Sequence, residues 1–368
     1  MKLYYKQLSP QDKKIHDVLL PAIINMDESC FVEGVTLTDS ESRYNTVYDI
    51  IQFIRQDYPE IFWAPFPKAK NCTSDGKDGV RITLHYPFTK EEKDTYQEHI
   101  DAYINMILSR FSSLSDYDYA IAVFEWLTKN VSYINSKNDD LLDEDNSIFG
   151  VFYNYQTRCL GYSCAFSLLM KKRNIRCSIC SSTLVGVRHV WNIVELDGVW
   201  CHVDACWADR DDIFSSESVN MSKYYYFGMT EKEALVDCRM PFFNKLRENG
   251  VSEISREYVP RFNKWPNADS HSNSYYVKNG LYFTDESPEI ICEIIKKKLF
   301  NSDDKTSDKR ISIRFAEKDT LLSFTKSLYT LVGNAVSELN KEHNLNYILN
   351  SASYNQEFNI CDMFFSAN

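Results

Sequence analysis

Glycine and positive charge are both scarce in this chain. It has 11 glycines among 368 residues and a formal net charge of −11 at pH 7. A nucleic-acid-binding surface needs clustered lysine and arginine side chains. The longest basic run, Lys296–Lys298, lies in a segment with the apolar periodicity of a helix and is better explained as one face of that helix. We therefore expect no nucleic-acid partner.

Long hydrophobic runs are also lacking. No window approaches the roughly 18 apolar residues of a membrane-spanning helix, so we expect no membrane span. Residues 1–20 are polar and charged and lack the pattern of a secretory leader. The cysteines number 11, and an odd count argues against a full disulfide framework. These features together predict a cytoplasmic protein with reduced thiols.

Aromatic and aliphatic side chains are plentiful by comparison. The chain has 24 tyrosines and 22 phenylalanines, and 44% of its residues are hydrophobic, which is typical of a folded protein. Its length suits one large domain or two to three modest ones. We predict an N-terminal α+β region over 1–110, a central region over 111–230 and a C-terminal α+β region over 231–368, with a polar linker around 266–273.

Local patterns predict the following elements. Apolar spacing indicates helices, and alternation indicates strands. Thr89-Lys-Glu-Glu92 is a capping-box signature that opens a helix. An Asn-Gly pair within 276–282 favours a hairpin turn, and the acidic stretch 138–146 is typical of a solvated loop. One predicted helix ends near residue 58, and four more cover 89–108, 116–129, 288–300 and 319–339. The predicted strands cover 80–86 and 311–315.

A cysteine opens an apolar segment in the run Thr157–Phe166. The residues after Cys159 are apolar on most sides of a helix, so we expect a buried helix that begins at this cysteine. Basic residues Lys171–Arg173 close the helix at the end where cations favour its dipole. At the N-terminal end the dipole and the backbone amides lower the pKa of a thiol and stabilise an oxyanion. Gly161 lets another backbone or a substrate approach the helix closely. Cys164, one turn further along, should be more buried and less reactive than Cys159.

Two strands downstream place a histidine and an aspartate on one face. The sequence Leu196-Asp-Gly-Val199 predicts a two-residue hairpin loop in which Leu196 faces Val199. In that register His189 and Asp204 lie diagonally across the two strands, with Cβ atoms about 7–8 Å apart. We therefore predict a catalytic triad. Cys159 is the nucleophile, His189 the general base and then acid, and Asp204 the group that orients the histidine.

These motifs resemble the transglutaminase-like core, a papain-related superfamily that includes transglutaminases, peptide N-glycanases and many bacterial thiol peptidases. The family's Cys-x-Gly-Tyr opening matches Cys159, Gly161 and Tyr162. Its His-Ala-Trp-Asn strand matches His189–Asn192, and its Val-Asp-x-Thr-Trp strand matches Val203–Trp207. The resemblance spans roughly residues 115 to 215. It implies an α+β fold in which the nucleophile helix packs on an antiparallel sheet, between flanking N- and C-terminal α+β regions.

The resemblance implies a thiol-dependent amide hydrolase or acyl transferase that works through a thioester and needs no cofactor. We favour a cysteine peptidase acting on a peptide or protein substrate, because no calcium loop of the animal cross-linking enzymes is present. The alternatives are a cross-linking transglutaminase and a non-catalytic binding module on the same scaffold. The presence of all three triad positions argues against the binding module, and solvent access to Cys159 discriminates between them.

Two positions depart from the family or stay open. Cys206 stands where the family usually has threonine, and the predicted register places it opposite His189 as a second possible thiol. The second oxyanion donor is not assigned by the sequence, and the candidates just upstream of the nucleophile are Tyr153, Asn154 and Gln156.

A metal site is the remaining alternative. The predicted face of the hairpin carries nitrogen, oxygen and sulfur ligands that zinc accepts, and Cys177-Ser-Ile-Cys180 has CxxC spacing. No second CxxC accompanies the first, and the two histidines lie far apart along the hairpin, so we expect no metal. The candidate ligands on this face are His189, His202, Asp204 and Cys206.

Overall fold

The computed structural model divides the chain into two compact units. Unit 1 comprises Met1–Asp209 and Ser255–Asn267, and unit 2 comprises Arg210–Ile254 and Ala268–Asn368. The predicted division at 110 and 230 stays a prediction, and most of the predicted acidic loop lies outside the described residues. None of the helices among the described residues combines the length and the hydrophobicity of a membrane span. The structure describes residues 2–35, 37, 39–65, 72–74, 79–134, 145–184, 187–209, 223–235, 259–260, 265–302, 307–356 and 358–367.

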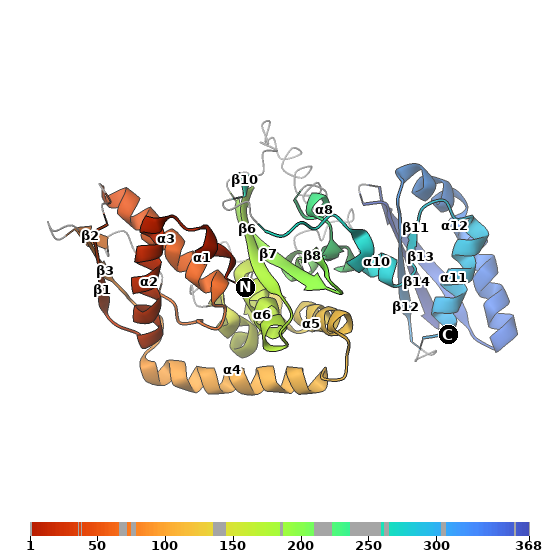
Figure 1. Cartoon of the computed structure of the whole chain (residues 1–368). Coiled ribbons are helices and arrows are strands. Elements are labelled where there is room, and N and C mark those ends of the chain that lie inside the picture. Colours follow the sequence, from red (N-terminus) through yellow and green to blue (C-terminus); the bar gives the residue numbers. More distant parts are fainter. Residues whose placement is uncertain are drawn as a thin grey trace. The chain divides into compact units, whose positions relative to one another are not determined.

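The first part of unit 1 is a small α+β layer (Figure 1). Helices α1 (Leu3–Gln7), α2 (Pro10–Asn25) and α3 (Ser40–Asp57) accompany an antiparallel sheet of order β1-β3-β2. Its strands are β1 (Ser29–Glu33), β2 (Cys72–Ser74) and β3 (Gly79–Thr83). The predicted helix ending near residue 58 is thus confirmed. The predicted strand at 80–86 is confirmed only over its first part, because β3 ends at Thr83.

Helix α1 is held by hydrogen bonds at both the backbone and the side chain of Tyr4. The carboxylate of Asp57, at the end of α3, accepts the backbone N–H groups of Tyr4 and Tyr5 at 3.2 and 2.9 Å. The hydroxyl of Tyr4 donates to the carbonyl of Ile179 at 3.0 Å. Since Tyr4 is almost fully buried, this short helix is an integral part of unit 1.

Two longer helices lead into the central part of unit 1. Helix α4 (Lys90–Arg110) begins with the predicted capping box, in which Thr89 and Glu92 exchange hydrogen bonds. Helix α5 (Asp116–Asn130) follows, capped by the side chain of Ser115. The predicted helices at 89–108 and 116–129 are therefore confirmed, with ends one or two residues further along.

The central part is a helix packed on an antiparallel sheet, the arrangement that the resemblance of the sequence motifs implies. A π-helix (Gly150–Asn154) and the short parallel pair β4 (Ser132–Tyr133) and β5 (Gln156–Thr157) precede helix α6 (Cys159–Lys172). Within unit 1 the sheet runs in the order β10-β6-β7-β8. Its strands are β6 (Cys177–Leu184), β7 (Val187–Leu196), β8 (Val199–Val203) and β10 (Val259–Pro260).

The hairpin of β7 and β8 has the predicted register as far as the strands extend. Leu196 pairs with Val199, and Asn192 pairs with Val203. The strand ends there, however, and Asp204 is the N-cap of a short helix, α7 (Ala205–Ala208). The expectation that Cys206 lies in a strand opposite His189 is therefore wrong, because the aspartate side chain caps a helix at this point.

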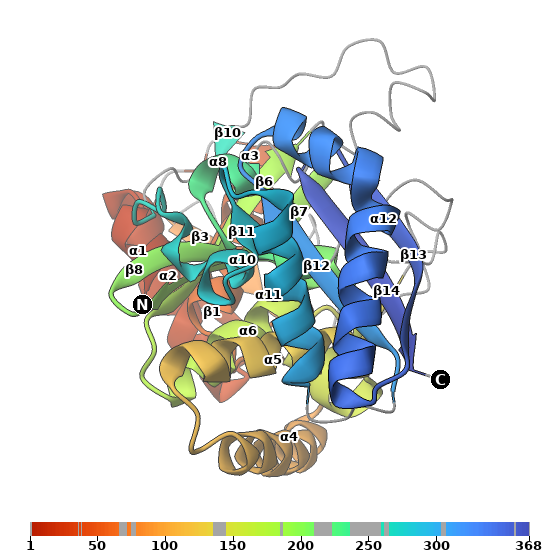
Figure 2. The same cartoon turned by 90° about the vertical axis from the view of Figure 1, so that its right-hand side faces the viewer.

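Unit 2 is a second α+β layer (Figure 2). Its sheet has the order β11-β12-β14-β13, with helices α11 (Pro288–Phe300) and α12 (Lys318–His343) side by side against it. The predicted helices at 288–300 and 319–339 and the predicted strand at 311–315 are confirmed. The strands are β11 (Tyr282–Phe283), β12 (Lys309–Phe315), β13 (Tyr347–Asn355) and β14 (Ile360–Ala367). The smaller elements are a 3₁₀ helix (Lys223–Tyr226), β9 (Phe227–Met229), α8 (Glu231–Leu235), another 3₁₀ helix (His271–Asn273) and α10 (Tyr275–Lys278).

The predicted hairpin at 276–282 is wrong. The segment instead ends α10, and Gly280 has a positive φ of 64°. The amide of Leu281 donates to the carbonyl of Tyr276 at 2.7 Å, and the amide of Gly280 donates to that of Val277 at 3.1 Å. These two bonds are those of a Schellman helix end. An Asn-Gly pair suits that left-handed position as well as it suits a hairpin turn.

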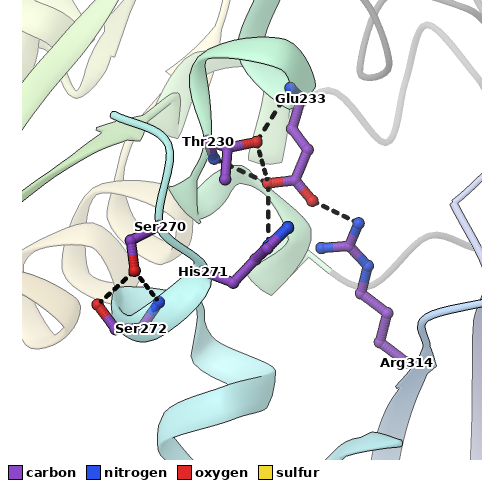
Figure 3. A network of polar contacts seen from close by, with 6 residues as sticks. All are labelled: Thr230, Glu233, Ser270, His271, Ser272 and Arg314. Atoms are coloured by element: carbon purple, nitrogen blue, oxygen red, sulfur yellow. Dashed lines mark hydrogen bonds and ion pairs between the residues drawn. The ribbon is translucent and has the colours of Figure 1, made fainter. Parts of the chain in front are cut away.

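A buried ion pair joins α8 to β12 within unit 2 (Figure 3). The Glu233 carboxylate contacts the Arg314 guanidinium, and it also accepts the backbone N–H of Thr230 at 2.8 Å. His271 Nδ1 lies 3.6 Å from the same carboxylate. Burial by itself would raise the pKa of Glu233, but the charges of Arg314 and His271 outweigh it and hold the pKa below its usual value. The pair is therefore ionised at neutral pH.

Candidate active site

The structure brings His189 and Asp204 together. His189 Nε2 lies 2.7 Å from Asp204 Oδ2, and the aspartate is fully buried. The other carboxylate oxygen, Oδ1, accepts the backbone N–H of Trp207 at 3.0 Å. The carboxylate thus has a partner at each oxygen, and its partner on the imidazole is Nε2.

Aromatic rings surround this imidazole. The His189 ring stacks on Trp191, with centroids 5.9 Å apart, and meets the edge of Trp207 at 5.7 Å. The His189 side chain is 12% exposed. These contacts restrict the rotation of the ring and keep most water away from the histidine–carboxylate bond, which strengthens it electrostatically.

Cys159 is the first residue of α6 and is partly exposed. Cys164, one turn further along, is buried, and burial raises the pKa of its thiol to about 12. The expectation that Cys164 is the more buried of the two is confirmed. Cys206 is also buried, with 1% of its surface exposed.

The second turn of α6 is tied to the elements that carry His189 and Asp204. The Asn192 side chain, from β7, donates to the carbonyl of Ser163 at 2.9 Å, and the Ser163 hydroxyl donates to the carbonyl of Cys159 at 2.9 Å. The hydroxyl of Tyr162 bonds to the Asp209 carboxylate, just after α7. These bonds fix the start of α6 against β7 and the end of α7.

Asn146 is a residue of this site that sequence reasoning missed. Its Oδ1 accepts the backbone N–H groups of Leu160 and Gly161, at 3.1 and 3.2 Å. Two amides of the first turn are therefore already bonded and do not serve an oxyanion. One sequence signal was present, since Arg158 occupies the N-cap position and has no short polar side chain to satisfy those amides.

Gly161 is required by close packing within the chain. A Cβ atom at this position would lie 1.9 Å from Oγ1 of Thr157 and 2.8 Å from the carbonyl oxygen of Ser147. The predicted close approach is thus made by the chain's own residues. Thr157 in turn donates to the carbonyl of Asp145 at 2.6 Å, so the loop before α6 is packed tightly against its first turn.

The three candidates for the second oxyanion donor differ in their surroundings. The Asn154 side-chain amide donates to Asp145 at 2.6 Å. Tyr153 is 41% exposed, and its ring packs against Tyr96 at 4.9 Å. Gln156 is exposed in β5. The assignment of this donor stays a prediction.

The side chains proposed as alternative zinc ligands have other roles in the structure. His202 is fully buried, and its Nδ1 accepts the indole N–H of Trp191 at 3.0 Å. Cys177 and Cys180 lie in β6 and pair with residues of β7. Among the described residues, no group of three or more His, Cys, Asp and Glu side chains is arranged to hold a metal ion.

Residues 106–205 match the family model described as the transglutaminase-like superfamily. This segment belongs to that superfamily. It contains α5, α6, the β7–β8 hairpin and all three predicted triad positions. The transglutaminase-like core of the chain therefore has the α+β fold that the sequence motifs imply.

Solved structures give weaker similarities. One, described as a TGase, is 14% identical with a TM-score of 0.27, and the match covers 48% of this chain and 50% of that one. Another, described as a "Putative Cysteine Protease" from Cytophaga hutchinsonii, is 14% identical with a TM-score of 0.25, covering 35% of this chain and 51% of that one. The match therefore spans about half the length of each of these two solved structures. No curated protein matches the chain.

Proposed function

We propose that this protein is a thiol-dependent enzyme that acts on amides through a Cys159–His189–Asp204 triad, and that its reaction is peptide hydrolysis. The observation that carries the proposal is the 2.7 Å contact between His189 Nε2 and a fully buried Asp204 carboxylate. Burying a carboxylate is unfavourable unless it is paired, so the burial of Asp204 calls for a functional or structural explanation. Orienting a catalytic imidazole is such an explanation.

The mechanism assigns one task to each residue. His189 takes the proton of the Cys159 thiol, and the thiolate attacks the carbonyl carbon of the substrate amide. The Asp204 carboxylate stabilises the imidazolium that results. His189 then protonates the leaving amine, which departs and leaves a thioester. Water, activated by the same imidazole, attacks the thioester, releases the acid and restores the thiol.

The ring nitrogen that faces the thiol follows from the geometry. Asp204 occupies the Nε2 side of His189, so proton exchange with Cys159 would use Nδ1. His189 and Asn192 are three residues apart on β7 and point to opposite faces of the sheet, and Asn192 faces α6. The proposal therefore requires Cys159, at the N-terminal end of α6, to lie close to His189 Nδ1 although the body of α6 packs on the other face of β7.

Three finer points belong to the same proposal. An amine in place of water would give cross-linking through the same thioester. We favour hydrolysis of a peptide or protein substrate in the cytoplasm, without a cofactor. The partly exposed Cys159 favours catalysis over a silent binding module, because a nucleophile must be reached by its substrate.

The test is iodoacetamide labelling of the whole chain from about pH 4 to about pH 9, with peptide mapping, in the native protein and in His189→Ala. An activated Cys159 labels rapidly well below pH 8, and the substitution slows it. If Cys159 labels at the rate of an ordinary thiol in both proteins, the proposed triad is wrong. Rapid labelling of Cys206 instead would move the nucleophile there.

A further inference from the structure

The first turn of α6 is held by a side chain from outside the helix. The two amides bonded by Asn146 Oδ1 belong to the two residues directly after Cys159. Amide groups at a helix start need acceptors, and the N-cap residue Arg158 provides none from its side chain. Asn146 therefore supplies the cap that the local sequence lacks.

Asn146 is itself held from the N-terminal part of unit 1. The guanidinium of Arg55, near the end of α3, donates to the backbone carbonyl of Asn146 at 3.0 Å. Arg55 is 3% exposed, and its own carbonyl lies 3.8 Å from the Cys164 sulfur, on the next turn of α6. Elements far apart in sequence thus converge on the start of the helix.

The capping side chain of Asn146 is neutral, and this distinguishes it from an aspartate. An aspartate would accept the same two amide hydrogens, and as an anion it would interact more favourably with the helix dipole. It would also add a negative charge at the helix end that carries Cys159, and a nearby like charge disfavours a thiolate. A neutral amide gives the acceptor without the charge.

We propose that Asn146 is a positioning residue of the candidate active site, which holds the first turn of α6 in place and keeps the surroundings of Cys159 free of added negative charge. The inference rests on the proposed function, since it assigns a reason for a neutral cap only where the thiol must ionise. Asn146 touches neither substrate nor reacting atoms in this account. Its effect is exerted through the helix start.

The test compares Asn146→Asp with a matched control, Ser115→Asp. Ser115 caps α5 in the same unit, and the neighbouring Asp116 lies 3.4 Å from Arg173, at the far end of α6. Helix α6 has 14 residues and is therefore about 21 Å long, so charge at Ser115 is well screened from Cys159. Both changes add one carboxylate at a helix start.

The quantity to measure is the pH midpoint of Cys159 alkylation, in the native chain and in both variants. Asn146→Asp should raise the midpoint by about one unit, which is about tenfold less thiolate at a fixed pH below it, with an unchanged rate at high pH. Ser115→Asp should leave the midpoint where it is. Equal midpoints in the two variants would overturn the proposal.

Hydrogen exchange provides the second measurement. The amides of Leu160 and Gly161 should exchange at least tenfold faster in Asn146→Ala, which has no acceptor, and at the native rate in Asn146→Asp. Native protection in the alanine variant would also overturn the proposal. If native Cys159 titrates like an ordinary thiol while Asn146→Asp still shifts it, the triad fails and the positioning role of Asn146 stands.

Discussion

At the scale of single residues, Asp204 combines two roles that can be separated. Its Oδ1 caps α7 by accepting the Trp207 amide, and its Oδ2 pairs with His189. The cap needs only an acceptor oxygen, whereas stabilising an imidazolium needs the negative charge. An asparagine at this position retains the first role and loses the second.

We predict that Asp204→Asn keeps the native fold but slows Cys159 alkylation near pH 7 by about 100-fold or more. The reason is that an uncharged partner no longer stabilises protonated His189. Alkylation rates with peptide mapping, alongside thermal unfolding, provide the measurement. Cys164, whose pKa is raised to about 12 by burial, is the internal control and should stay unlabelled in both folded proteins. An undiminished rate at Cys159 would show that Asp204 is purely structural.

At the scale of elements, two glycines in helices predict opposite effects of the same substitution. Gly161→Ala in α6 forces a Cβ into Thr157 and the backbone of Ser147, and should destabilise the fold by about 1–3 kcal/mol. Gly333→Ala in α12 meets no atom within 4 Å and should stabilise it by about 0.5–1 kcal/mol. Urea unfolding of the two variants gives both values. Equal shifts would contradict the packing at the start of α6.

The elements also show how far sequence patterns reach. Helix α4 and the β7–β8 hairpin were predictable because a capping box and an Asp-Gly turn act over a few residues. The end of β8 was not, because Asp204 satisfies a helix amide instead of continuing the strand. Asn279–Gly280 was misjudged because both a turn and a helix end need a residue with positive φ.

The candidate site divides along the same line. The closeness of His189 and Asp204 was predictable from pleat and register up to the end of β8, and the structure pairs them although Asp204 itself caps α7. Asn146 was not, since it contacts residues 14 and 15 positions further along the chain and no periodic pattern links them. Arg55 acts across a longer separation still. Interactions of this kind depend on the fold as a whole, which local spacing does not encode.

At the scale of the whole molecule, unit 2 carries an acid-sensitive contact. The pKa of Glu233 is held below its usual value despite burial, mainly because of Arg314. A carboxyl group with a depressed folded pKa stabilises the fold fully above its unfolded pKa, near 4.5, and this stabilisation is lost as the pH falls through the folded pKa. Unit 2 should therefore weaken on acidification below about pH 4.5.

We predict that Glu233→Gln removes this part of the pH dependence and destabilises unit 2 by about 3–5 kcal/mol at neutral pH, since Arg314 is left buried without a counter-charge. Hydrogen exchange of peptides from β12 and β14, measured on the full chain at several pH values, reads out unit 2 separately from unit 1. A variant as stable as the native chain would mean that the pair contributes little.

The contacts of α1 and Arg55 have a practical meaning for anyone who wishes to express the catalytic segment alone. A fragment cut at the family boundaries, 106–205, would lack Tyr4, whose hydroxyl bonds β6, and Arg55, which holds Asn146. It would expose the surface that α1 and α3 cover and leave two backbone carbonyls without these donors. The family boundaries are shorter than the compact unit to which the segment belongs, so an expression fragment should begin at α1.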